Sequence, residues 1–111
     1  MPPRRPIKQN EVELIQYLLK TLGLQAEDFP VATLVEEYEG GIMGSIGLGN
    51  HEEIPYDGDF IQVNYIDTDG VPVVITLTKN TDGQLLDLDF WKQDFSKLIT
   101  YPKPEDISIA H

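Results

Sequence analysis

Several residue types are absent from this chain or rare in it. None of the 111 residues is cysteine, which excludes a disulfide framework, thiol catalysis and a thiolate metal site. No apolar run approaches the roughly 20 residues that a membrane-spanning helix needs. The first ten residues are basic but lack the apolar core of a signal peptide. We therefore expect a cytoplasmic protein that has no membrane partner.

Positive charge is also scarce. The chain has 8 Lys and Arg against 19 Asp and Glu, which gives a net charge of −11. The excess lies entirely after residue 30, because residues 1–30 hold four residues of each sign. Such a field repels nucleic acid and attracts basic partners. We therefore expect no nucleic-acid partner, and the acidity serves either solubility or the binding of a basic protein.

The length and apolar content indicate a single domain, residues 1–111. Hydrophobic residues make up 41% of the chain, which is enough to form a core. Residues 1–9 hold three prolines and three basic residues, and residues 101–111 hold two prolines. We expect both ends to be loose tails.

One helix is expected near the N-terminus, from Glu11 to Leu22. Asn10 is a candidate N-cap, Glu13 completes a capping-box pattern, and Gly23 is a candidate C-cap. Residues at helical spacing form one apolar stripe, which consists of Val12, Ile15, Leu18, Leu19 and Leu22.

About five antiparallel strands are expected after the helix. Gly40 and Gly41 predict a hairpin turn, and Gly44 allows a close approach of two backbones. Short loops that end in Gly70 and Gly83 then join three strands into a meander. The strand segments are residues 31–39, 42–48, 59–67, 71–79 and 84–91. The fold class is therefore α+β, with the N-terminal helix packed on an antiparallel sheet.

The last strand segment contains the only tryptophan, and its side chains alternate. One set comprises Leu86, Leu88 and Phe90, and the other comprises Leu85, Asp87, Asp89 and Trp91. Beyond it, the spacing of Trp91, Phe95 and Leu98 is typical of a short helical turn that leaves Lys92 in solvent. We expect Trp91 to be buried and to anchor this strand together with Phe90 and Phe95.

A polar sheet face is expected on the side away from the helix, and it is the candidate binding surface. It collects Gln62, Asn64, Thr76, Thr78, Asp87 and Asp89. This assignment depends on the register of the strands, since a shift by one residue inverts the two faces.

Motifs for metal, cofactor or catalytic chemistry are weak. Asp67-x-Asp69-Gly70 is similar to the start of a calcium loop, but its twelfth position is Thr78 where such a loop needs Glu. The glycine-rich residues 40–49 lack the following helix and lysine of a phosphate loop. Asp87 and Asp89 could act as an acid–base pair, but no His or Arg motif accompanies them. We therefore expect no metal and no cofactor.

Two segments resemble a known family. Residues 39–46, EGGIMGSI, resemble a DGGMGS-L motif with Ile42 inserted and Glu39 in place of Asp. Residues 86–98, LDLDFWKQDFSKL, resemble an ELDIWKVDFSPL motif. Both motifs mark an uncharacterised family of small bacterial proteins, a domain of unknown function, and the likeness covers about residues 33–98. The resemblance implies no activity and no functional residues.

Three functional hypotheses follow. The first is a non-enzymatic acidic binding protein, an inhibitor or toxin-immunity protein, because small acidic proteins of this size are similar to immunity proteins. The second is a small enzyme that uses Asp87 and Asp89, which a pocket converging on both carboxylates would favour. The third is a structural protein that forms a homodimer or larger oligomer, which an apolar patch around Trp91 and Tyr65 would favour.

Overall fold

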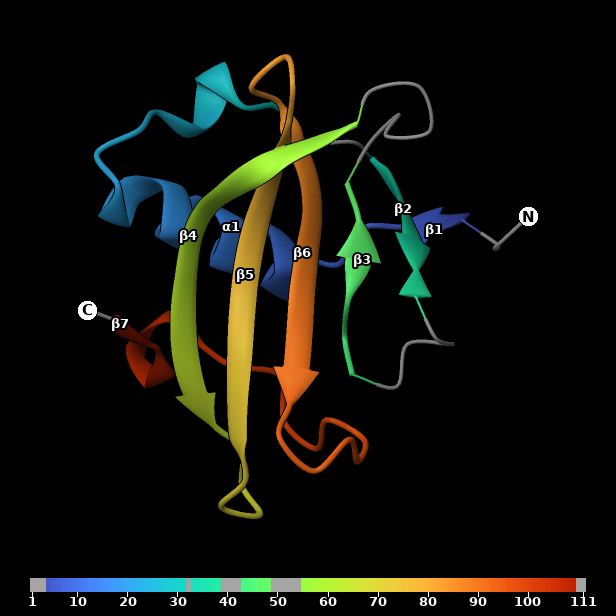
Figure 1. Cartoon of the computed structure of the whole chain (residues 1–111), viewed down its shortest axis with the longest axis vertical. Helices are drawn as coiled ribbons and strands as arrows, with labels where there is room; N and C mark the ends of the chain where they lie inside the picture. The colour runs from blue at the N-terminus through green and yellow to red at the C-terminus, as the bar shows by residue number, and fades with distance from the viewer. Residues whose placement is uncertain (1–3, 32, 39–42, 49–54, 110–111) are drawn as a thin grey trace.

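The computed structural model describes residues 4–31, 33–38, 43–48 and 55–109 of the chain (Figure 1). The strands are β1 (Arg4–Pro6), β2 (Leu34–Glu37), β3 (Ile46–Gly47), β4 (Tyr56–Ile66), β5 (Pro72–Asn80), β6 (Leu85–Lys92) and β7 (Ser108–Ile109). The helices are α1 (Gln9–Thr21) and the short 3₁₀ helices η1 (Ala26–Asp28) and η3 (Pro104–Asp106).

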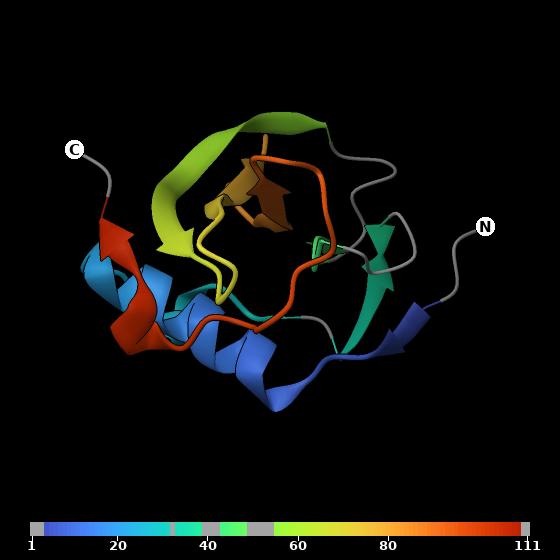
Figure 2. The ribbon, with the colours of Figure 1, turned by 90° about the horizontal axis from the view of Figure 1, so that it is seen from below.

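All strands in this described part of the chain join one antiparallel sheet, in the order β1-β2-β3-β6-β5-β4-β7. Figure 2 shows that the sheet curls around α1, which lies on its concave side. The α+β class that the sequence predicts is therefore confirmed. The sheet has seven strands rather than about five because the short strands β1 and β7 extend its two edges.

Strands β4, β5 and β6 form the meander that the alternation predicts. The turns between them depend on Gly70 and Gly83, whose φ angles of +80° and +77° are accessible to glycine without strain. The register shifts twice between β4 and β5, and once between β5 and β6 opposite Thr78. Each shift inserts a residue that bends its strand, which contributes to the curvature of the sheet.

Helix α1 begins two residues before the predicted start. Its N-cap is Lys8 and not Asn10, because the side chain of Glu11 fixes this turn. The Oε1 atom of Glu11 accepts a hydrogen bond from the Lys8 backbone N–H at 2.8 Å. Both carboxylate oxygens of Glu11 also accept from the Arg5 guanidinium, at 2.9 and 2.7 Å. At the other end Gly23, with φ +76°, follows the C-cap residue, as a helix-ending glycine should.

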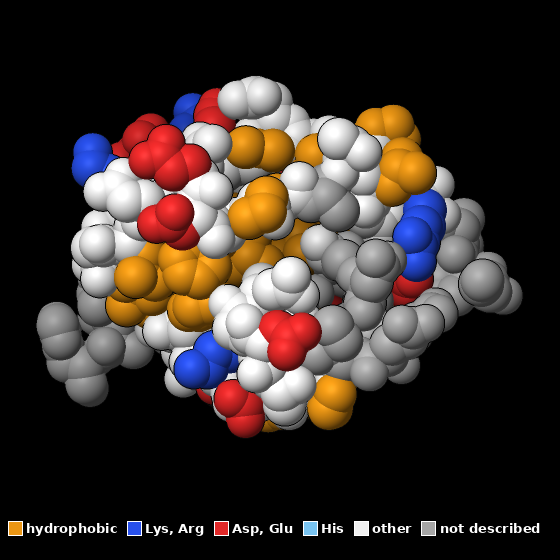
Figure 3. Space-filling model, turned by 90° about the horizontal axis from the view of Figure 1, so that it is seen from above, with side chains coloured by type: hydrophobic (Ala, Val, Ile, Leu, Met, Phe, Trp, Pro, Cys, Tyr) orange, Lys and Arg blue, Asp and Glu red, His pale blue; other side chains and the backbone are white. Residues whose placement is uncertain are grey.

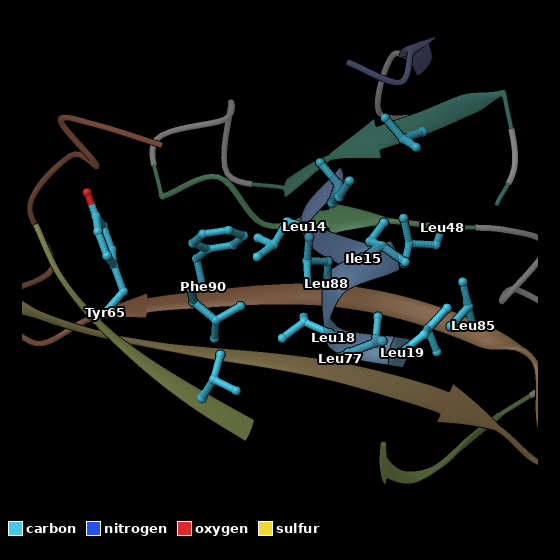
Figure 4. Close-up of a cluster of buried hydrophobic side chains, with 14 of the residues drawn as sticks. Leu14, Ile15, Leu18, Leu19, Leu48, Tyr65, Leu77, Leu85, Leu88 and Phe90 are labelled. Atoms are coloured by element: carbon cyan, nitrogen blue, oxygen red, sulfur yellow. The ribbon is translucent and has the colours of Figure 1, made fainter. Parts of the chain in front are cut away.

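The core lies between α1 and the concave face of the sheet (Figure 4). The helix contributes Leu14, Ile15, Leu18 and Leu19, all of them buried. Leu14 is thus buried in place of Val12 and Leu22 of the predicted stripe, because the buried face is centred on the i, i+4 pairs Leu14–Leu18 and Ile15–Leu19, and Leu22 is the exposed C-cap. The sheet contributes Val35, Ile46, Leu48, Val63, Tyr65, Val73, Ile75, Leu77, Leu85, Leu88 and Phe90.

The predicted alternation is wrong for the first residues of β6. Leu85 belongs to the core, although the pattern placed it with Asp87 and Asp89. Leu86 is buried but lies outside this core cluster. The register shift opposite Thr78 explains the difference, because the inserted residue reverses the alternation in the first part of the strand.

The chain ends, which the sequence predicts to be loose, contain strands that belong to the sheet. β1 pairs with β2, and β7 pairs with β4. On the N-terminal side, Arg5 Nε lies 2.9 Å from Glu37 Oε2 while the same guanidinium contacts α1. On the C-terminal side, Tyr101 packs against Phe90 with 5.3 Å between ring centroids, and η3 packs on α1. These contacts offset the conformational entropy that is lost when the two ends become ordered.

Lys92 is fully buried, in contrast to the prediction that it lies in solvent. Strand β6 continues through Lys92, so its side chain points inward like that of Phe90. Its Nζ atom donates to Asp67 Oδ2 at 2.9 Å, to Asp69 Oδ2 at 2.7 Å and to the Lys97 carbonyl oxygen at 3.0 Å. We refer to Lys92, Asp67 and Asp69 as the Lys92 cluster. All three protons of the ammonium group therefore have an acceptor.

The helices in the described ranges include none that is long and apolar enough to cross a membrane.

Candidate functional site

The convex face of β4, β5 and β6, which points away from α1, carries the candidate site. Cross-strand pairing places Gln62, Thr76 and Asp89 in one row, because Thr76 pairs with both of the others. The next row consists of Asn64, Val74 and Trp91. Side chains directly opposite each other on one face are in contact range. We call these six residues and the adjoining Asp87 the outer face.

Asp89 is the most open acid of the outer face. Its side chain is exposed, and it forms no hydrogen bond or ion pair with any residue that the structure describes. Partial removal of water around the carboxyl raises its pKa, and the negative charges of Asp87 and Asp59 raise it further. The folded protein thus holds Asp89 in a position where its charge is uncompensated, which favours a cationic ligand.

Asp87 has a structural role instead. Its Oδ1 atom accepts a hydrogen bond of 2.6 Å from the Tyr38 hydroxyl, which follows β2 on the far side of β3. Its backbone N–H donates to Thr78 Oγ1 at 2.9 Å, and the Thr78 hydroxyl donates to its carbonyl oxygen at 3.3 Å. Thr78 is buried and satisfies the backbone where the register shifts. Asp87 and Thr78 therefore hold β6 in place and are poorly available to a ligand.

Trp91 lies on the outer face, so the prediction that it is buried is wrong. Its side chain is 56% exposed, and its ring contacts Phe95 with 6.1 Å between centroids. Phe95 itself is 68% exposed and adopts φ +62° in a turn, where a helical turn was predicted. The helical spacing fails because β6 extends through Lys92, which directs Trp91 outward by strand alternation. Phe90 is buried as predicted.

An open pocket of about 380 Å³ lies beside Trp91 on this face. It is lined by Met43, Ser45, Gln62, Val74, Thr76, Asp89, Phe90, Trp91 and Phe95. Its volume is near the lower end of the range of about 300–1,000 Å³ that is usual for ligand pockets. The pocket therefore suits one side chain or a small ligand better than a large cofactor.

Ser45 and Gly44 shape the wall of this pocket. Among the described residues, the pairing of β3 with β6 comprises Ile46 with Leu88 and Gly47 with Asp87, and it does not extend to Asp89 and Phe90. The Ser45 hydroxyl takes over there, since it accepts from Phe90 N–H at 2.8 Å and donates to Phe90 carbonyl at 3.2 Å. Gly44 has φ +94°, and a Cβ on it would lie 3.2 Å from Leu98. The sequence predicts that Gly44 allows two backbones to approach each other, whereas the atoms nearest to this Cβ position belong to the side chains of Leu98 and Phe90. Gly40 and Gly41 lie outside the described residues.

Asn64 lies on the outer face but outside this pocket. It pairs with Ser108 of β7 and lines a separate hollow near Thr68 and Thr100. Its distance from the Asp89 row follows from its position two residues along β4 from Gln62. The structure therefore brings Gln62, Thr76 and Asp89 together and leaves Asn64 aside.

A larger hollow, of about 570 Å³, opens at the end of the molecule where β5 turns into β6. Figure 3 shows apolar side chains between carboxylates at this end. Phe29, Pro30 and Val31 contribute to its wall, with Asp82 of the β5–β6 turn on the other side. None of the site residues predicted from the sequence belongs to the lining of this hollow.

The chemistry that the outer face can perform is that of a hydrogen-bond acceptor. Among the described residues no group of three or more His, Asp or Glu side chains is arranged to hold a metal ion. Asp69 and Asp67, which looked like the start of a calcium loop, accept from the buried Lys92 instead. The pocket is lined by one carboxylate, one side-chain amide and two hydroxyl groups, and no Lys, Arg or His side chain lines it.

Sequence reasoning missed the apolar part of the site. Val74, Met43 and Phe95 line the pocket beside Trp91, and none of them was assigned to the binding face. The alternation of β6 contained the signal for Trp91, because it placed this residue on the same side as Asp89. No local pattern could have brought Met43 to the pocket, since its position depends on where β3 ends.

Comparison with known proteins gives a family and no function. Neither curated proteins nor solved structures gave a match to this chain. A family model described as "Domain of unknown function (DUF6984)" matches residues 4–102, a longer stretch than the likeness seen in the sequence. The expectation of a family without a known activity is confirmed, and the chain belongs to the DUF6984 family.

Proposed function

We propose that this domain is a non-enzymatic binding protein whose outer face meets a basic surface of a partner protein. The observation that carries the proposal is Asp89, an exposed carboxylate without a hydrogen bond or ion pair among the described residues, next to the exposed Trp91. Tryptophan is enriched among the residues that contribute most binding energy at protein interfaces. A cationic partner would compensate the charge of Asp89 and cover the indole in one contact.

The electrostatic field supports a basic partner. Glu36, Asp87, Asp89 and Asp59 lie along or beside the outer face, and Arg4 of the neighbouring β1 is already paired with Glu36 at 3.5 Å. The net charge of −11 extends this negative field into the solvent. Opposite charge on a partner raises the association rate and excludes acidic competitors.

A second copy of the chain is a less suitable partner for this face. A twofold-symmetric dimer places the same patch of both copies in contact. Asp89 of one copy would then approach the acids of the other, and like charges at an interface oppose binding. Tyr65, whose exposure would have favoured an apolar dimer patch, is only 4% exposed. The homodimer expectation therefore remains the weaker alternative.

An enzyme based on Asp87 and Asp89 is also less favoured. An acid–base pair needs two carboxyl groups that both reach the substrate. The Asp87 carboxylate accepts from Tyr38, and the pocket is lined by Asp89 but not by Asp87. The two carboxyl groups thus have different surroundings and no common cavity.

The specific form that we propose is an inhibitor or toxin-immunity protein of bacterial origin that acts in the cytoplasm. An acidic inhibitor of a basic enzyme gains association rate from its charge, which the field around the outer face supplies. Co-expression with a basic toxin encoded beside it should protect the cell, and cell fractionation would test the location. Loss of protection on Asp89→Asn would link the activity to this face.

The direct test compares the proteins that three baits capture from the source cells: the wild type, Asp89→Asn and Asp82→Asn. The amount of each captured protein is quantified by mass spectrometry. We expect a basic protein whose recovery falls with Asp89→Asn but not with Asp82→Asn. Asp82 is a matched control because it is an exposed acid in the β5–β6 turn, away from the pocket. Equal recovery with both variants, or a partner that is acidic, would contradict the proposal.

A further inference from the structure

We infer that the pocket beside Trp91 takes the side chain of an arginine from the basic partner. This inference rests on the proposed function and adds the chemical group that enters the pocket. The aromatic rings of Trp91 and Phe95 line one part of the pocket, and Asp89 and Thr76 line another. The cavity therefore combines an exposed π surface with a carboxylate.

The polar groups of the pocket are suited to a ligand rich in donors. Asp89 supplies a carboxylate that has no hydrogen bond or ion pair among the described residues. Gln62 Nε2 donates to Thr76 Oγ1 at 3.3 Å, which leaves the side-chain oxygen Oε1 of Gln62 as an acceptor. A guanidinium group carries five N–H donors and no acceptor. An anion would find no positively charged side chain in the lining of this pocket.

Arginine fits this arrangement better than lysine. Asp89 and Trp91 are two residues apart on one face of β6, a Cα separation of about 6.5–7 Å. A planar guanidinium can stack on an indole and pair with a carboxylate through its edge at the same time, because it is weakly hydrated and delocalised. An ammonium group is compact and strongly hydrated, so it gains the ion pair but less from the ring.

The pocket is preformed by the fold. The hydroxyl of Ser45 bonds both backbone groups of Phe90 and so fixes the wall opposite Val74. Strand pairing fixes Thr76 opposite Asp89 and Val74 opposite Trp91. A site that is already ordered loses little conformational entropy when it binds, which favours affinity for a single side chain.

The test uses two short glycine peptides that differ only in a central arginine or lysine, together with poly-lysine. Because Trp91 is the single tryptophan, its fluorescence reports on the pocket directly. We expect the arginine peptide to bind at least about fivefold more tightly than the lysine peptide, the effect of stacking on an aromatic ring. Calorimetry with the Asp89→Asn, Trp91→Leu and Asp82→Asn variants then assigns the contributions.

Asp89→Asn should weaken the binding of both peptides, because it removes the carboxylate. Trp91→Leu should abolish only the preference for the arginine peptide over the lysine peptide, because it removes the indole. Asp82→Asn should change neither. Should Trp91→Leu fail to fold, Phe95→Ala offers a second variant, since the Phe95 ring is even more exposed. In that variant the preference should shrink while binding of the lysine peptide persists.

Three results would overturn the inference in different ways. Equal affinity for the two peptides, with loss of both on Asp89→Asn, would reject the arginine pocket and leave a basic partner in place. Binding of poly-lysine that is equally sensitive to Asp82→Asn and Asp89→Asn would reject the outer face itself, and with it the proposed function. A dimer in sedimentation that shields Trp91 from a soluble quencher would assign the pocket to a second copy of the chain.

Discussion

The Nζ atom of Lys92 lies 2.9 Å from Oδ2 of Asp67, and both side chains are completely removed from solvent. The carboxylate of Asp67 has four further hydrogen-bond contacts. Thr68 N–H and Thr100 N–H donate to its Oδ1 at 2.7 and 3.1 Å, and Ile99 N–H donates to its Oδ2 at 2.8 Å. The fourth is the weak contact of the Thr68 hydroxyl at 3.5 Å. Asp67 therefore ties β6 and the C-terminal segment to the β4–β5 turn.

Replacement of Asp67 should destabilise the protein strongly. Asp67→Ala removes an acceptor from a buried cation and leaves three backbone N–H groups without the carboxylate that they bond, so we expect a loss of about 3–5 kcal/mol in the free energy of unfolding. Urea denaturation followed by circular dichroism measures it. Asp94→Ala is the control, because Asp94 is exposed and Ser96 is its one hydrogen-bond partner among the described residues, and it should cost less than about 1 kcal/mol. Equal losses in both variants would contradict the assigned role.

The contribution of Asp67 should vanish in acid. Burial by itself would raise the pKa of Asp67, but hydrogen bonds from Ile99 N–H, Lys92, Thr68 N–H and Thr100 N–H outweigh it and hold the pKa well below its usual range. A lowered native pKa means that the stabilisation is complete above the ordinary value of about 3.9 and declines as the pH falls through the native pKa. The stability difference between wild type and Asp67→Asn should therefore shrink between about pH 5 and pH 2. A difference that grows on acidification would show the opposite sign of linkage.

Trp91 should behave as a surface residue in solution. With 56% of its side chain exposed, its emission should be close to that of the unfolded chain and should respond to a soluble quencher. Trp91→Ala should cost less than about 1.5 kcal/mol, because only the contact with Phe95 and partial burial are lost. A loss of the 3–5 kcal/mol typical of a core aromatic would place the indole inside.

Asp89 and Asp87 should respond differently to the same substitution. The raised pKa of Asp89 means that its charge opposes folding at neutral pH, so Asp89→Asn should leave the melting temperature unchanged or higher. Asp87→Asn alters the acceptor of the Tyr38 hydroxyl and should lower it. Thermal unfolding of the two variants side by side makes the comparison. A fall for Asp89→Asn alone would mean that Asp89 has a stabilising contact in solution.

Gly44 should be less replaceable than Gly70. Both have positive φ, +94° and +80°, so alanine strains either backbone by about 1–2 kcal/mol. A Cβ at Gly44 would also lie 3.2 Å from Leu98 and 3.6 Å from Phe90, whereas nothing lies within 4 Å at Gly70. Gly44→Ala should therefore lower the melting temperature by more than Gly70→Ala. Identical shifts would exclude a role for the contact with Leu98.

The meander could be predicted because its information is local. Apolar and polar side chains alternate along each strand from β4 to β6. Gly70 and Gly83 occupy turn positions with positive φ, which favour glycine. The same alternation placed Trp91 on the side of Asp89. The prediction that Trp91 is buried followed instead from its helical spacing with Phe95 and Leu98, and this spacing fails because β6 continues through Lys92.

Other features depend on residues that are distant in sequence. One more step of the alternation directs Lys92 inward, but a buried lysine needs acceptors, and Asp67 is 25 residues away. The N-cap at Lys8 depends likewise on Arg5, which bonds Glu11 and contacts Glu37 of β2. Such partners are defined by tertiary structure, and no motif in the sequence marks them.

The hydrogen bonds of Asp67 also fix an order of events during protein synthesis. Ile99 and Thr100 lie 32 and 33 residues beyond Asp67, so the ribosome adds them only after β4, β5 and β6 have been made. Helix α1 is made before β2 to β6, yet the segment that carries Tyr101 and η3, which packs on this helix, is made after them. A nascent chain halted before residue 97 would hold Lys92 without the Lys97 carbonyl as an acceptor, and the part of the helix on which η3 packs would stay uncovered and accessible to chaperones.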